Sequence, residues 1–221
     1  KHKAEAENEI SSLVPEKAIN FTANGKRRAE ANGWTIEINS KGGIGSLTYN
    51  GEQVIKRNEE ALISYRSFCY KDYDFWLNHY SRDLDQTAVW ALGDFARPNL
   101  KNFEGQYPAG RFDYRLDKIS SVGNTVKANL RCNKKLCEEL GAPRLIQVIY
   151  TLTEDGPDIE VSWYNKDANR LTEAIYLNFF PNTEKINLTK LGSKIKPEEV
   201  TRNGSRNLHA VQNISFNKYK I

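Results

Sequence analysis

The sequence lacks several features on which common functions depend. Its 221 residues contain no methionine, even at position 1, from which we expect that the chain does not begin where translation starts. No apolar run approaches the roughly 18 residues that span a bilayer, and the charged start KHKAEAENE is not a signal peptide. The 32 basic and 28 acidic side chains are interspersed along the chain. We therefore expect no membrane partner and no nucleic-acid partner.

Histidine and cysteine are too scarce for the commonest catalytic and metal sites. The three histidines are His2, His79 and His209, and no GxSxG or HxxxH pattern occurs. Cys132 and Cys137 do not have the spacing of a zinc knuckle or a redox motif. They form either a disulfide in an exported protein or, as we favour, buried or reduced thiols. We expect no catalytic residue, no metal ligand and no cofactor in this chain.

The chain nevertheless has the composition of a folded domain. Its hydrophobic fraction is 39%, and it contains 4 Trp, 11 Tyr and 9 Phe. This is too much core-forming material for a disordered chain. The length fits one large domain.

Alternating apolar and polar residues predict antiparallel β-strands. In residues 34–38, Trp34, Ile36 and Ile38 fall on one face, which is the period of a half-buried strand. The Asn50-Gly51 pair is a strong hairpin signal. Further strands are expected at residues 44–49, 61–70, 110–119, 125–132, 144–153, 158–165 and 174–180. In the pair 144–153 and 158–165, charged side chains occupy an outer face, and we expect Trp163 in the core.

Helical segments are few and short. We expect them at residues 72–82 and 133–140, with Gly141 ending the second. Together with turn residues that join successive strands, this predicts an all-β fold, a large antiparallel β-sandwich with one or two short helices. We expect residues 1–31 to be a linker or packing arm and residues 32–221 to be the sandwich domain.

The stretch from Tyr73 to Tyr107 is unusually rich in aromatic and bidentate polar side chains. Sugars present an apolar C–H face and a rim of hydroxyls, so aromatic platforms beside such polar groups are typical of a carbohydrate site. The candidate carbohydrate-binding residues are Trp76, Tyr80, Arg82, Asp83 and Trp90. The alternative interpretation is that the tryptophans are core aromatics under a long connection between strands.

Three phrases, in order, carry a family resemblance that covers about two thirds of the chain. They are GWTIEINSKGGIGSLTYNGEQV, LIQVIYTLTEDGPDIEVSWYNKDANRLTEAIYLNFFP and GSRNLHAV, the last at residues 204–211. The sequence resembles the C-terminal β-region of class II α-mannosidase-like glycoside hydrolases and their uncharacterised relatives. The resemblance implies a galactose-mutarotase-like supersandwich, incomplete as given because the relatives continue with further strands after the position of His209.

The resemblance also implies a function. In that family the catalytic nucleophile and the zinc ligands lie in an N-terminal (β/α) domain, whose motifs are not found here. It therefore implies a non-catalytic sandwich that packs on a catalytic (β/α) domain of the same protein and helps to shape its sugar cleft. Carbohydrate is the implied partner, and we expect a secreted or periplasmic location.

Three other hypotheses stay open. One is an autonomous carbohydrate-binding module, in which Trp76, Tyr80 and Trp90 stack openly on sugar. It predicts glycan affinity without a partner domain. Another is a structural scaffold without a ligand.

The remaining hypothesis is a mutarotase- or epimerase-like enzyme, which needs a carboxylate base and a histidine acid in one cleft. Its candidates are His79 or His209, paired with Asp83 or Glu173. Enzymes of this kind usually need two well-placed histidines, and the spacing here does not suggest them.

Overall fold

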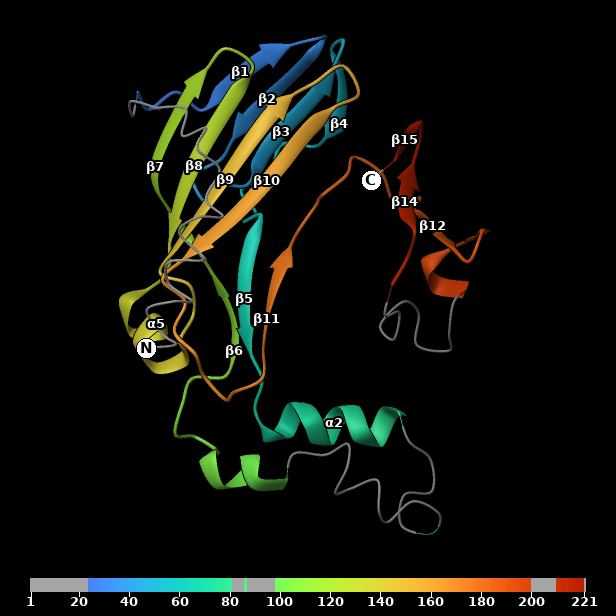
Figure 1. Cartoon of the computed structure of the whole chain (residues 1–221). Helices are drawn as coiled ribbons and strands as arrows, with labels where there is room; N and C mark the ends of the chain where they lie inside the picture. Colours follow the sequence, from blue (N-terminus) through green and yellow to red (C-terminus); the bar gives the residue numbers. More distant parts are fainter. Residues whose placement is uncertain (1–23, 81–85, 87–97, 200–209, 221) are drawn as a thin grey trace, which may run out of the picture.

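The computed structural model describes residues 24–80, 86, 98–199 and 210–220, and it is built mainly of antiparallel strands (Figure 1). One sheet has the order β1-β2-β3-β4, with β1 (Arg28–Ala31), β2 (Trp34–Ile38), β3 (Ile44–Tyr49) and β4 (Glu52–Ile55). A second has the order β10-β9-β8-β7, with β7 (Arg115–Val122), β8 (Thr125–Arg131), β9 (Leu145–Leu152) and β10 (Pro157–Tyr164).

These two sheets pack face to face and enclose the main core. Ile36 and Ile38 of β2 belong to the same buried cluster as Val126 of β8 and Ile146 of β9. The Tyr150 hydroxyl crosses the interface and donates to the Gly42 carbonyl oxygen at 2.8 Å. The predicted all-β, sandwich-like fold is therefore confirmed.

Two smaller sheets extend the sandwich. One has the order β11-β5-β6, with β5 (Ile63–Ser67), β6 (Gly110–Asp113) and β11 (Glu173–Leu177). It lies between the sandwich and helix α2 (Tyr70–Tyr80) (Figure 1). The other has the order β13-β12-β14-β15, with β12 (Asn187–Lys190), β13 (Ser193–Ile195), β14 (Asn213–Phe216) and β15 (Tyr219–Lys220).

Helices are short, as the sequence predicts. Helix α5 (Lys134–Leu140) begins at its N-cap Asn133, whose side chain accepts from the Lys135 amide, and ends at Gly141, which has a φ of 67°. Two 3₁₀ turns, η1 (Pro98–Phe103) and η2 (Pro197–Glu199), lie in connections. None of the helices in the described ranges has the length and apolar character that a bilayer crossing needs.

The structure departs from the sequence prediction at two places, before β2 and within residues 110–119. Residues Arg28–Ala31, expected in the arm, form β1 and pair with β2 along its length. The segment expected as one strand at residues 110–119 is divided at Tyr114 into β6 and β7, which belong to different sheets. Tyr114 is buried and donates from its hydroxyl to the Pro143 carbonyl oxygen at 2.8 Å, which fixes the bend.

The expectation that Trp163 is a core residue is wrong. Trp163 lies directly opposite Ile146 in the β9–β10 pair, so the two side chains share the inward face of the sheet. Ile146 is completely buried, whereas Trp163 is 55% exposed. The layer that covers this face does not reach the end of β10, which is an edge strand.

Candidate functional site

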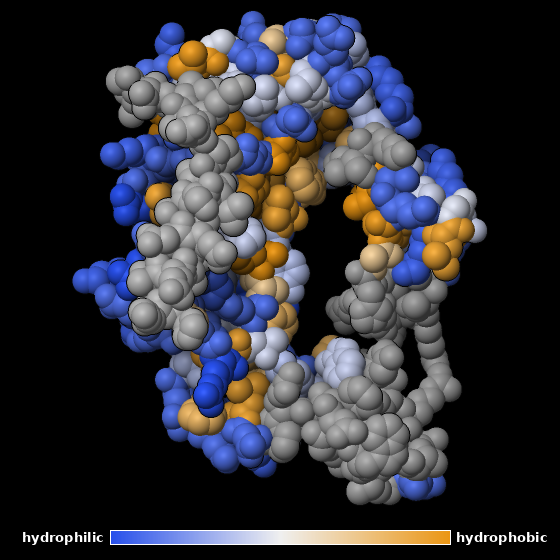
Figure 2. All heavy atoms as spheres, viewed as in Figure 1, coloured by the Kyte–Doolittle hydropathy of each residue, from blue (hydrophilic) through white to orange (hydrophobic). Residues whose placement is uncertain are grey.

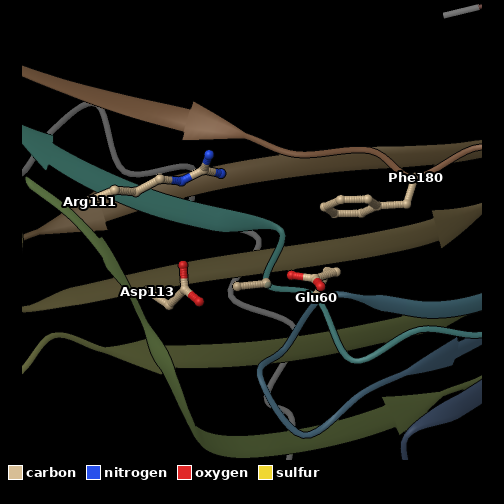
Figure 3. Close-up of a pocket in the computed structure, with 5 residues that line it drawn as sticks. Glu60, Arg111, Asp113 and Phe180 are labelled. Carbon is tan, nitrogen blue, oxygen red and sulfur yellow. The ribbon is translucent and has the colours of Figure 1, made fainter.

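An open pocket of about 460 Å³ lies where the three-stranded sheet meets the sandwich (Figure 3). Its lining residues are Glu60, Ala61, Arg111, Asp113 and Phe180. They come from three distant parts of the chain, namely the segment before β5, the strand β6, and the segment after β11. The pocket is therefore a product of the fold and not of a local motif.

A buried asparagine fixes the backbone on the Glu60 side of the pocket. The Asn39 side chain donates to the Glu60 carbonyl oxygen at 2.7 Å and accepts from the Gly43 amide at 2.9 Å. Gly43 packs so closely here that an added Cβ would lie 2.8 Å from the Leu62 nitrogen. The tight turn and the asparagine together hold Glu60 and Ala61 in place.

Arg111 is held by two polar neighbours. Its Nε donates to the Ser64 hydroxyl at 2.8 Å, and its Nη2 donates to the Asn178 Oδ1 at 2.5 Å. Its guanidinium also lies over the Tyr176 ring, 5.8 Å from the ring centroid. These two bonds use two of its five N–H donors, and among the described residues no further hydrogen bond from Arg111 is present.

The pocket lining carries charges of both signs. Glu60 and Asp113 are acidic, and Arg111 is basic. Asp113 faces Ser64 across the β5–β6 pair, and its carboxylate lies 3.4 Å from the Nζ of Lys41, which is not a lining residue. The site therefore offers both hydrogen-bond acceptors and donors.

Phe180 forms the apolar wall of the pocket. Its side chain is 40% exposed, and its ring points toward Glu60 (Figure 3). The next residue, Pro181, makes an antiparallel bridge to Ile55, and Asn182 donates its amide to the Val54 carbonyl oxygen at 2.9 Å. These contacts tie the backbone that carries Phe180 to the edge strand β4.

The pocket differs from the site that the sequence predicts. Trp76 lies on α2 and is 37% exposed, and Tyr80 is the last residue of that helix. Arg82, Asp83 and Trp90 lie outside the described residues. Since α2 follows β5 and Glu60 precedes it, the two sites lie toward opposite ends of that strand.

Glu173, a candidate base, is engaged in a partly buried network. Its Oε1 lies 2.5 Å from the Lys166 Nζ, and its Oε2 accepts from the Tyr65 hydroxyl at 2.6 Å. The pKa of Tyr65 is raised above its ordinary value. The main cause is burial, and the second is the hydrogen bond to the Glu173 carboxylate. The side chain of His79 and all of His209 fall outside the described structure, so their pairing with Glu173 or Asp83 stays a prediction.

The thiols of Cys69, Cys132 and Cys137 are all free. Burial, together with the neighbouring Cys137 thiol, raises the pKa of Cys132 to about 12. Within the described ranges, no group of three or more His, Cys, Asp or Glu side chains is arranged to hold a metal ion.

The arrangement of acidic, basic and aromatic side chains at the pocket favours binding of a polar ligand by hydrogen bonds.

The model of a family described as a domain of unknown function (DUF5054) matches residues 1–161. No curated protein and no solved structure matches the chain.

Proposed function

The chain belongs to the DUF5054 family, whose function is unknown, and from the resemblance of its sequence to the C-terminal β-region of class II α-mannosidase-like glycoside hydrolases we propose that it is the non-catalytic β-sandwich region of a larger carbohydrate-active hydrolase. In this role the sandwich packs on a catalytic domain and helps to shape the sugar cleft. A secreted or periplasmic location is part of the same proposal.

The observation that carries the proposal is the exposed core face at the end of β10. Ile159, Val161 and Trp163 point to the same side as the buried residues of β9; Ile159 and Val161 are half-buried, whereas Trp163 is exposed. A sheet face with an apolar pattern is stable only when another layer covers it. The pattern of β10 therefore favours a further layer over Trp163.

Exposed apolar side chains on β11 support the same interpretation. Tyr176 is 38% exposed and Leu177 is 46% exposed, on a strand that pairs with β5 on one side only in the described structure. Hydrophobic residues also border the opening between the sandwich and the β12–β15 sheet (Figure 2). Large exposed apolar areas commonly mark interfaces with another protein surface.

The test uses the full-length product of the gene and compares substitutions of two exposed aromatic residues. Trp163→Ser is expected to loosen the packing of the sandwich on its neighbouring domain, seen as faster limited proteolysis between the two and a lower rate of aryl-glycoside hydrolysis. Phe103→Ser removes another exposed aromatic side chain, on η1, and is expected to leave both measurements unchanged.

Two results would contradict the proposal. One is glycoside hydrolysis by the 221-residue chain on its own, which would place catalytic groups within it. The other is unchanged proteolysis and hydrolysis in Trp163→Ser. Loss of glycan binding in Trp76→Ser alone would instead favour an autonomous carbohydrate-binding module.

A further inference from the structure

We propose that the pocket lined by Glu60, Ala61, Arg111, Asp113 and Phe180 binds one neutral sugar residue, through its hydroxyl groups and its C–H face. The inference deepens the proposed function, on which it rests for the carbohydrate class of the ligand. It places the sugar at the junction of the three-stranded sheet and the sandwich, away from the predicted residues on α2.

The size of the pocket suits a small polar molecule. Its volume of about 460 Å³ falls within the range of about 300–1,000 Å³ that is typical of small-molecule sites. The pocket is open on one side, so it can take a terminal sugar of a longer glycan.

The mixed charges of the lining favour a neutral ligand. The carboxylates of Glu60 and Asp113 would repel a phosphate, and the Arg111 guanidinium would repel a cation. A sugar avoids both costs, because each hydroxyl both donates and accepts a hydrogen bond. The carboxylates accept from hydroxyl groups, and the three remaining N–H groups of Arg111 donate to hydroxyl oxygens.

Phe180 supplies the apolar contact that distinguishes a sugar from other polar molecules. Its ring is partly exposed and faces Glu60 across the pocket (Figure 3). One face of a pyranose carries mainly C–H groups, which gain from burial against an aromatic ring. A sugar lying on Phe180 would therefore direct its hydroxyl rim toward Glu60 and Arg111.

The Arg111 guanidinium and the backbone that carries Glu60 are already in position before a ligand binds. Asn39 holds the Glu60 backbone at 2.7 Å, and Ser64 and Asn178 hold Arg111. Asn178 is itself fixed, since its backbone amide donates to the Leu62 carbonyl oxygen at 2.8 Å. Pre-organised groups lose little entropy on binding, which favours measurable affinity even in a shallow pocket.

The experiment is a titration of the isotopically labelled chain with neutral methyl hexopyranosides, followed by backbone amide shifts. We expect saturable binding with a Kd on the order of 1 mM, and shifts centred on residues 60–61 and 111–113. Phe180→Ala and Glu60→Gln should each weaken binding at least tenfold. Phe103→Ala removes another exposed phenylalanine, which is 51% exposed and lies on η1 outside the pocket lining, and should have no effect.

Two outcomes would overturn the inference. One is no amide shift at these residues with roughly 100 mM glycoside, far above the expected Kd. The other is tighter binding of inorganic phosphate or of lysine methyl ester at the same residues. If Trp163→Ser loosens the domain packing as expected but the pocket binds no sugar, this site alone is rejected. If the pocket binds sugar but Trp163→Ser does not change the domain packing, the packing function alone is rejected.

Discussion

Trp163 and Ile146 lie directly opposite each other on β10 and β9, yet one is 55% exposed and the other is completely buried. The difference in exposure between the two side chains marks the edge of the buried core. Replacing the two residues should therefore have very different effects on stability.

We expect Ile146→Ala to lower the free energy of unfolding by about 2–5 kcal/mol, because it leaves a cavity in a packed core. Trp163→Ser should change the same quantity by about 1 kcal/mol or less, because half of that side chain is already in water. Urea unfolding of the two variants measures both values. Equal losses would mean that another part of the chain covers Trp163 in solution.

Gly43→Ala should displace the backbone at Glu60, which lines the pocket. The added Cβ would lie 2.8 Å from the Leu62 nitrogen and still closer to the Glu60 carbonyl oxygen, both of which are backbone atoms. We expect a loss of about 1–3 kcal/mol in the free energy of unfolding, and shifted amide signals at residues 60–62. The control is Gly51→Ala, where nothing lies within 4 Å of the added Cβ and only the strain of a φ of 82° applies. Unshifted signals at residues 60–62 in Gly43→Ala would show that the turn is looser than described.

Cys132 should be poorly reactive in the folded chain. Burial, more than any other cause, raises the pKa of Cys132 to about 12, so little of the reactive thiolate is present at pH 8. We expect iodoacetamide to modify Cys132 far more slowly in buffer than in concentrated urea, with the modified peptide identified by mass spectrometry. Equal rates would mean that the thiol is accessible and ionises normally.

Tyr150 should make the stability of the sandwich sensitive to alkaline pH. Burial raises the pKa of Tyr150, so its neutral form is retained in the folded state. The corresponding stability is fully present below the unfolded pKa of about 10 and is lost as pH rises above it.

At pH 8, Tyr150→Phe should cost about 1 kcal/mol, because it removes the 2.8 Å hydrogen bond to the Gly42 carbonyl oxygen. At pH 11 this deficit should shrink or reverse, since the phenylalanine variant cannot gain a phenolate on unfolding. Urea unfolding at the two pH values tests this. A deficit that grows at pH 11 would contradict it.

Local signals in the sequence predict the local parts of this fold. The alternation of apolar and polar residues identifies β2 and β3, and Asn50-Gly51 marks the hairpin between β3 and β4. The Asn133 and Gly141 caps mark the ends of α5. In each case the deciding contacts lie within a few residues of one another. The turn geometry and the apolar pattern therefore indicate the same structure.

The parts that the sequence does not predict depend on distant contacts. Tyr114 interrupts an apparently continuous strand because its hydroxyl reaches Pro143, and Trp163 is exposed because the facing layer stops short of it. The pocket joins positions 60, 111 and 180, none of which carries a motif. Only the packing of the sheets brings these residues together.

The division of one strand into β6 and β7 at Tyr114 also limits how the chain can be dissected. The strand that lines the pocket continues into the sandwich sheet through a single residue that is 1% exposed. A fragment designed to keep the sandwich without the pocket sheet would have to be cut at this buried tyrosine. We therefore expect the two sheets to fold together, and truncated forms for crystallography or binding assays should keep both.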